Sequence, residues 1–218
     1  MGGWALGGWL TVTFLAWFAN VSGNPWLSSL FSLAVLAPPL FLLEEEELRS
    51  LVSFRKEGWP LAFLLLLAVL LAPYLGLVLM TRGYLKAFFI HPDLKGALGF
   101  WGGKMLVASG LAAAEELFFR GYLQEGLFRR LWGTKGIGRR KDALLTYKNL
   151  ASSLLFALAH VISYGSLLRL GAFFSSLLLG WVVERSERSL WPAALLHTVS
   201  NVAGSWFWLI ISLNFPLS

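Results

Sequence analysis

The sequence predicts an all-α fold, a polytopic transmembrane helical bundle of about seven to eight spans. Hydrophobic residues make up 57% of the 218 and charged residues only 14%, whereas roughly a quarter of a soluble domain is charged. The apolar residues gather in runs that mostly reach the ~20 residues needed to cross a bilayer. These runs lack the two-residue alternation of barrel strands, so helices are the structure that satisfies their backbone groups in lipid.

Apolar runs follow one another along the chain and are separated by short polar stretches. They cover about residues 4–21, 25–43, 59–80, 97–127, 149–164, 167–184 and 190–213. The first run has neither a basic start nor a small-residue cleavage site, so we expect a span rather than a signal peptide. The fifth is short, and we expect it to be tilted or to lie in a locally distorted bilayer. Residues 1–218 are expected to form a single transmembrane domain.

The polar stretches predict how the bundle is oriented. Lys and Arg concentrate on the side of the amino terminus, with three in 44–58, seven in 129–148 and two in 185–188, against three in 81–96 on the other side. Loops rich in these residues stay in the cytoplasm. We therefore expect a multi-pass protein of the cell membrane with a cytoplasmic amino terminus. The net charge of +6 then points to membrane lipid as a partner and not to nucleic acid.

A few polar side chains lie inside the apolar runs, where an ionised group near the bilayer centre costs on the order of 2.5–3.5 kcal/mol. They form three groups in three different predicted spans. The groups are Glu115, Glu116 and Arg120 in the fourth run, His160 in the fifth, and His197 and Asn201 in the seventh. This cost predicts that the groups face one another across a wet or protein-lined cavity formed by spans four, five and seven.

Helical spacing indicates which of these side chains can act together. Glu116 and Arg120 are four residues apart, so they share a helix face and can form an ion pair. Glu115 then points about 100° away from Glu116 and is free for another role. His197 and Asn201 are also four residues apart, so both can face the same cavity.

These residue types suit water-mediated hydrolysis of an amide. Glu115 can act as a general base, with His160 sharing the water. His197 and Asn201 can donate hydrogen bonds to a developing oxyanion. Metal hydrolysis is the alternative, because Glu115, His160 and His197 together match a known zinc ligand set. Thiolate sites are excluded, since the chain has no cysteine.

Simpler structural roles compete with these assignments. Glu116 with Arg120 can be an ion pair that only stabilises the helices, and His197 with Asn201 can be polar contacts between helices. A single buried histidine such as His160 is more often structural than catalytic. Each structural explanation accounts for only one of the three groups, so the presence of all three favours a shared active site.

The same residues form three motifs that resemble the CPBP family, which comprises the type II CAAX prenyl endopeptidases and their bacterial relatives, also called the Abi family. The family pattern is EExxxR, then FxxxH, then HxxxN on successive membrane helices. This sequence carries EELFFR, FALAH and HTVSN, beginning at Glu115, Phe156 and His197. The motifs fall within a predicted catalytic core over residues 97–204.

The resemblance implies a role for each motif residue. Glu115 resembles the glutamate that activates water, and His160 resembles the second water-activating residue. Glu116 and Arg120 resemble the supporting pair, and His197 and Asn201 resemble the pair that stabilises the oxyanion. Members of the family have been called metalloproteases, but the family also supports a metal-free glutamate mechanism. We favour the metal-free mechanism, with a divalent metal such as zinc as the alternative cofactor.

The sequence thus predicts an intramembrane endopeptidase that cleaves a membrane-embedded or lipidated peptide. The main alternative is a non-enzymatic membrane protein that binds a peptide or confers immunity to a bacteriocin. A third candidate is a transporter or proton-coupled channel, since buried glutamate and histidine can relay protons. The substrate, the cleavage position and the oligomeric state are left open by the sequence.

Overall fold

The computed structural model describes residues 2–22, 25–80, 109–133 and 144–214, and these ranges hold helices and turns with no β-strand. The long helices follow the predicted apolar runs. They are α1 (Gly2–Ser22), α2 (Pro25–Leu42), α4 (Trp59–Met80), α7 (Tyr147–Tyr164), α8 (Ala172–Arg185) and α9 (Trp191–Asn214). The prediction of an all-α chain is confirmed for the described ranges.

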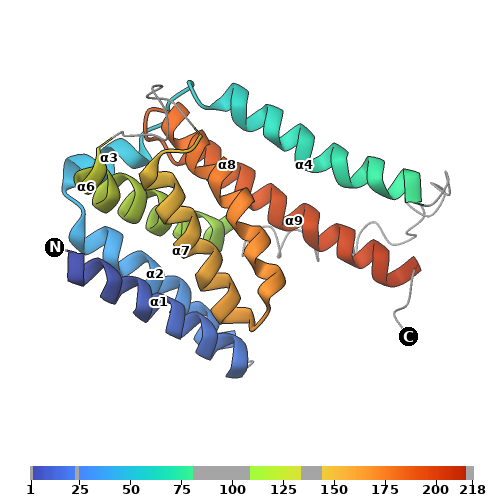
Figure 1. Cartoon of the computed structure of the whole chain (residues 1–218), viewed down its shortest axis with the longest axis horizontal. Helices are drawn as coiled ribbons and strands as arrows, with labels where there is room; N and C mark the ends of the chain where they lie inside the picture. The colour runs from blue at the N-terminus through green and yellow to red at the C-terminus, as the bar shows by residue number, and fades with distance from the viewer. Residues whose placement is uncertain (1, 23–24, 81–108, 134–143, 215–218) are drawn as a thin grey trace.

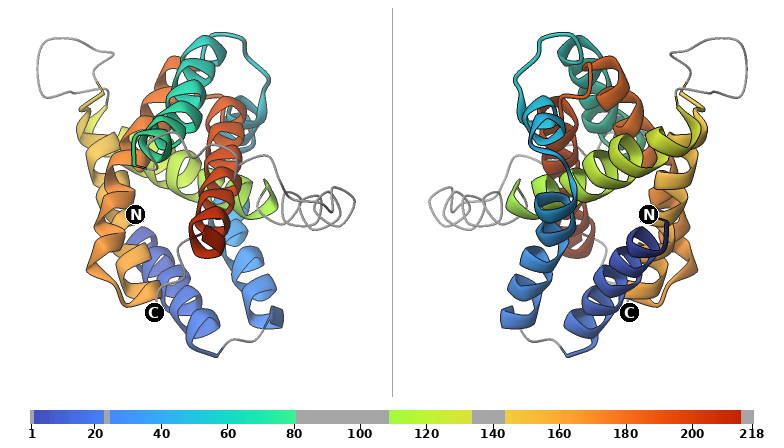
Figure 2. Two further views of the ribbon diagram at one scale, coloured as in Figure 1. Left: turned by 90° about the vertical axis from the view of Figure 1, so that its right-hand side faces the viewer. Right: turned by 90° about the vertical axis from the view of Figure 1, so that its left-hand side faces the viewer.

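Neighbouring helices pack side by side into a bundle (Figure 1). The α1–α2 pair and α4 lie on opposite sides of this bundle (Figure 2). Two hydrogen bonds tie α1 to α7: the Trp9 indole donates to Leu155 O at 3.1 Å, and the Asn20 amide donates to Ser163 O at 2.9 Å. Asn20 follows Trp9 in α1, and its partner Ser163 follows Leu155 in α7. The two helices therefore run parallel.

The segment carrying the double glutamate changes its helix type. Residues 109–116 are α-helical, and η2 (Leu117–Phe128) continues as a π-helix, in which each N–H bonds the carbonyl five residues earlier. A hydrogen bond of this kind joins Arg129 N–H to Gln124 O. Hydrophobic periodicity predicted only a helix here. The wider hydrogen-bond ring is a finding of the structure, and such rings occur frequently at functional sites.

Two hydrophobic clusters hold the helices together. One gathers residues of α1, α2, η2 and α7, including Val35, Phe118 and Leu123. The other gathers residues of α3 (Glu45–Val52), α4, α8 and α9, including Leu51 and Val182. The elements η2, α7 and α9, which carry Arg120, His160 and His197, therefore pack within or between these two clusters.

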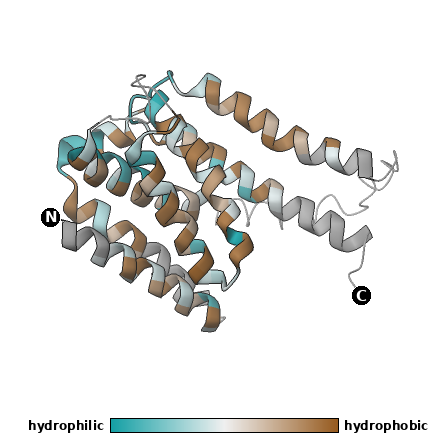
Figure 3. Cartoon of the chain, viewed as in Figure 1, coloured by the Kyte–Doolittle hydropathy of each residue, from teal (hydrophilic) through white to brown (hydrophobic). Residues whose placement is uncertain are grey.

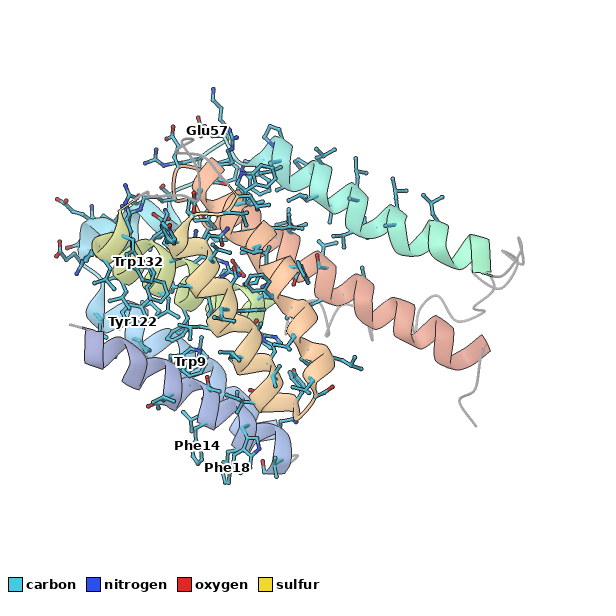
Figure 4. The ribbon with its side chains drawn as sticks, viewed as in Figure 1. Trp9, Phe14, Phe18, Glu57, Tyr122 and Trp132 are labelled. Atoms are coloured by element: carbon cyan, nitrogen blue, oxygen red, sulfur yellow. The ribbon has the colours of Figure 1, made fainter. Side chains whose placement is uncertain are left out.

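The outward faces of several helices are also apolar. Trp9 points from α1 toward α7, whereas Phe14 and Phe18 point away from the bundle (Figure 4). Their exposed fractions are 59% for Phe14 and 44% for Phe18. Exposed apolar side chains also line α4, among them Leu64 and Leu67. Contiguous apolar faces of this kind are typical of contact with lipid or with another apolar surface.

One helical segment among the described residues, Leu167–Arg185, is both long and apolar enough to cross a membrane, and Trp59–Ala72 is a shorter apolar helix. Both helices are described in this way by their length and their apolar composition. The number of membrane crossings, about seven to eight, stays a prediction.

The predicted polar loop 44–58 contains a short helix, α3 (Glu45–Val52). Glu44 and Glu47 form a capping box at its start, which satisfies backbone N–H groups of the first turn. Leu51 is fully buried, and its carbonyl accepts a hydrogen bond from Leu190 N–H at 2.9 Å. Hydrophilic residues gather at this end of the bundle, around α3 and α6 (Arg129–Trp132) (Figure 3).

Candidate active site

The predicted Glu116–Arg120 pair is present and fully buried. Arg120 Nε lies 3.4 Å from Glu116 Oε2, and neither side chain is accessible to solvent. Arg120 also donates from Nη1 to Ser152 Oγ at 3.1 Å and from Nη2 to Ser176 Oγ at 2.7 Å. A buried charge is tolerable when it is both paired and hydrogen-bonded, and Arg120 meets both conditions.

His197 lies between the two glutamates. Its Nδ1 is 2.9 Å from Glu116 Oε1, a hydrogen bond, and its Nε2 is 3.6 Å from Glu115 Oε2. The Glu115 side chain keeps 13% of its surface exposed, whereas the Glu116 side chain is inaccessible. The two neighbouring carboxylates therefore have different surroundings, as the spacing predicted: one is held by Arg120 and the other is partly accessible.

The ring of His160 is fixed by its own helix. Its Nδ1 lies 3.0 Å from Phe156 O, and a carbonyl oxygen can only accept, so Nδ1 carries the proton. In the neutral ring, Nε2 then has the free lone pair. The Phe156 ring connects the two histidines: its centroid lies 4.3 Å from the His160 ring and 6.0 Å from the His197 ring.

A cavity of about 360 Å³ opens beside these histidines. His160, His197 and Asn201 line it together with Arg169, and leucine side chains such as Leu65 and Leu179 form apolar parts of its wall. The predicted spans five and seven thus contribute as expected. Span four was also expected to line the cavity, but its described residues 109–127 do not. Residues of α4, η3 (Leu167–Gly171) and α8 line it together with α7 and α9.

This correction follows from how η2 packs. Its polar side chains point into the contact with α7 and α8, where Arg120 meets two serines, and do not face the open space. Glu115 is next to the cavity, because its Oε2 lies 3.6 Å from Nε2 of His197, and His197 lines the cavity.

The model for the type II CAAX prenyl endopeptidase Rce1-like family matches residues 97–203, the segment that holds all three motifs and, within its described part, the geometry above. This part of the chain belongs to the Rce1-like family. No curated protein and no solved structure matches the chain.

The match to the Rce1-like family indicates the class of activity. The family comprises CAAX-type proteases, which are hydrolases associated with membranes. The resemblance inferred from EELFFR, FALAH and HTVSN is therefore confirmed.

A metal ion would need several ligand side chains converging on one point of the site. Among the described residues, which include Glu115, His160 and His197, no three His, Cys, Asp or Glu side chains are placed to hold one ion. In this arrangement Glu115, His160 and His197 are not gathered as a metal ligand set, and the choice between the metal-free and the metal-dependent mechanism stays a prediction.

Sequence reasoning missed the residues that support Arg120. Ser152 and Ser176 are both fully buried and both accept hydrogen bonds from its guanidinium. Serine is common in helices, so no composition signal marked these two. The only available signal was position, because Ser152 lies one turn before Phe156 in the second motif.

A second buried ionic cluster was also missed. Glu125 is only 1% exposed, and its carboxylate contacts Lys148, with Arg129 at 2.8 Å and Arg188 at 3.3 Å. Sequence analysis placed Arg129 and Lys148 in a loop and did not single out Glu125 at the end of its run. A carboxylate inside a predicted span was the signal that could have found it.

Proposed function

We propose that the chain is an intramembrane endopeptidase that hydrolyses a peptide bond of a membrane-embedded or lipidated peptide. One observation carries this proposal: His197 is held between Glu115 and Glu116 at the edge of a cavity that His160 and Asn201 also line. This arrangement offers a base, an oxyanion donor and room for a peptide segment at one place.

In the proposed mechanism Glu115 and His160 activate the attacking water. Glu115 is the partly accessible carboxylate, and His160 presents Nε2 as an acceptor because Nδ1 donates to the backbone. The water oxygen bonds to the carbonyl carbon as its proton passes to this pair. Family resemblance gives Glu115 and His160 the same roles.

The proposed oxyanion donors are His197 and Asn201. Attack by water converts the carbonyl oxygen into an anion, which needs donors already in place. Nδ1 of His197 donates to Glu116, which orients the ring. Nε2, which lies on the side of Glu115, can donate to the oxyanion when the ring carries both protons, and the two neighbouring carboxylates favour that charged form. Collapse of the tetrahedral intermediate breaks the C–N bond, and the proton held by Glu115 and His160 passes to the leaving amine.

The proposed enzyme is a multi-pass protein of the cell membrane. Residues 1–218 would form one transmembrane domain of about seven to eight spans, with residues 97–204 as its catalytic core and the amino terminus in the cytoplasm. The exposed apolar side chains of α1 and α4 support contact with lipid. The parallel course of α1 and α7 supports the topology, because spans one and five must cross in the same direction.

Cleavage of a library of quenched-fluorescence membrane peptides by the purified protein tests the proposal. We expect wild type to cleave at least one peptide and Glu115→Gln to lose activity by at least about 100-fold, since the general base is gone. Glu57→Gln, which changes an exposed carboxylate outside the site, is the matched control and should cleave like wild type.

Two further outcomes have defined meanings. Cleavage that survives a chelator supports the metal-free mechanism, whereas loss that added zinc restores would overturn it. Full activity of Glu115→Gln would remove the proposed base. A wild type that binds peptides but cleaves none would favour the non-enzymatic alternative.

A further inference from the structure

The guanidinium of Arg120 is held by hydroxyl groups from two helices outside its own segment. Nη1 bonds Ser152 Oγ of α7, and Nη2 bonds Ser176 Oγ of α8. The remaining nitrogen, Nε, faces Glu116 Oε2 at 3.4 Å. Each nitrogen therefore has its own neighbour. Contacts with α7, with α8 and with Glu116 together hold the plane of the guanidinium in one orientation.

Ser152 is oriented to accept from Arg120. Its hydroxyl carries a single proton, and this proton is donated to Phe119 O at 2.7 Å. The oxygen lone pairs are then left for Arg120 Nη1 at 3.1 Å. The Ser152 hydroxyl thus connects the Phe119 carbonyl of η2 with the Arg120 side chain of the same helix. This connection resists rotation of the guanidinium.

Ser176 reaches Arg120 because α8 approaches η2 and α7 closely. Gly180 lies one turn after Ser176, and a Cβ built there would clash with Asn149 Oδ1 and lie 2.6 Å from Gln124 Oε1. In place of a side chain, Gly180 offers its carbonyl, which accepts from Gln124 Nε2 at 3.1 Å. The absent Cβ lets the helices come close enough for the 2.7 Å bond from Arg120 to Ser176.

We propose that Ser152 and Ser176 are positioning residues, which set the orientation of His197 through Arg120 and Glu116. The connected contacts are short: the serines bond Arg120, Arg120 pairs with Glu116, and Glu116 Oε1 lies 2.9 Å from His197 Nδ1. Neither serine lines the cavity. Their effect on turnover rests on the proposed function, whereas their effect on the His197 ring does not.

Kinetics of Ser152→Ala, Ser176→Ala and the double variant test the effect on turnover. Losing a hydrogen bond to a charged group should lower kcat about tenfold for each single variant and more for the double variant. KM should stay within about twofold, because the serines lie outside the cavity, and the pH profile of kcat should shift, because the hydrogen bond that orients His197 is loosened.

Ser153→Ala is the matched control. Ser153 is also fully buried on α7, next to Ser152, but its hydroxyl donates to Asn149 Oδ1 of the same helix at 3.2 Å. This variant should lose a comparable amount of thermal stability and keep the wild-type kcat and pH profile. Thermal unfolding of every variant shows whether it folds. If Ser176→Ala does not fold, Ser152→Ala alone carries the test.

Nuclear magnetic resonance of selectively ¹⁵N-labelled histidine gives a readout independent of activity. The chain has only three histidines, so its imidazole signals can be assigned with His91→Gln and His160→Gln variants. We expect Ser152→Ala and Ser176→Ala to shift the His197 ring signals and leave those of His160 in place, with no shift in Ser153→Ala. Unchanged His197 signals and kcat in both serine variants would overturn the proposal. A wild type that cleaves nothing, with His197 signals that still shift, would refute only the proposed function.

Discussion

At the scale of single residues, Arg120 shows how the fold accommodates a charge inside its core. It is a fully buried cation whose neighbours are one carboxylate, two hydroxyls and the face of the Phe156 ring, 5.4 Å from Cζ. Sequence spacing predicted its pairing with Glu116, because i and i+4 lie on one face of any α-helix. Spacing could not predict the serine contacts, since they join η2 to helices more than 30 residues away.

Replacing Arg120 by Met should cost about 3–5 kcal/mol of folding free energy, because it leaves the Glu116 carboxylate buried without a cation. Thermal or denaturant unfolding of the purified variant measures this loss. Arg49→Met is the matched control, since Arg49 also pairs with a carboxylate four residues away but the pair is 78% and 76% exposed. That change should stay within about 0.5 kcal/mol. Equal stability of Arg120→Met and wild type would show that the pair contributes nothing.

At the scale of helices, α8 proves more important to the site than its sequence indicated. The apolar run 167–184 carries no motif, so sequence analysis assigned it only a span. In the structure α8 supplies Ser176, offers the Gly180 carbonyl and lines the cavity with Leu179. Small residues at helix contacts allow this close approach, but their partners depend on helix rotation, which periodicity does not determine.

Gly180→Ala should push α8 away from α7 and η2 and destabilise the protein by about 1–3 kcal/mol. Its Cβ would clash with Asn149 and crowd Gln124. Gly204→Ala in α9 is the control, because a Cβ there meets nothing within 4 Å and alanine is the better helix former. Thermal unfolding of both variants measures the difference. A Gly180→Ala protein as stable as Gly204→Ala would contradict the close contact.

The buried Glu125 cluster makes a separate prediction for the junction of η2 and α7. Glu125→Gln should destabilise the protein by about 3 kcal/mol, because Lys148 is only 3% exposed and would keep only the more distant Glu184, at 3.8 Å. The loss should depend little on salt, since a buried pair is weakly screened. Unfolding at low and high ionic strength checks both statements. The exposed Glu45→Gln should change stability by less than about 0.5 kcal/mol, and a similar small value for Glu125→Gln would refute the prediction.

At the scale of the whole molecule, the distribution of Lys and Arg predicts how the bundle crosses the membrane. The expected topology places the 44–58 stretch in the cytoplasm and the turn between α7 and α8 outside. The parallel α1 and α7 agree with this arrangement. The fold itself is compatible with either orientation in the membrane, so labelling of intact cells has to decide between them.

Single cysteines can report this orientation, because the natural chain has none. Leu167→Cys, at a position 75% exposed, should react with a membrane-impermeant maleimide in intact cells, and the exposed Glu57→Cys should react only after the cells are opened. The cysteine-free parent protein is the blank. The reverse labelling pattern would place the amino terminus outside.

The sequence by itself determined the helical class, the approximate bounds of the long helices and the identity of the polar residues inside them. Each of these follows from local properties: apolar run length, the charge composition of a run, and the i, i+4 spacing of Glu116 with Arg120. The motifs were also sufficient to indicate the family, because their order along the chain is a one-dimensional property.

Only the tertiary structure decided which residues meet. It placed His197 between two carboxylates, turned η2 into a π-helix, moved its polar face into the contact with α7 and α8, and brought α4 and α8 to the cavity wall. These features depend on helix rotation and on contacts between residues far apart in the chain. Hydropathy and spacing do not encode either quantity, because they describe one helix at a time.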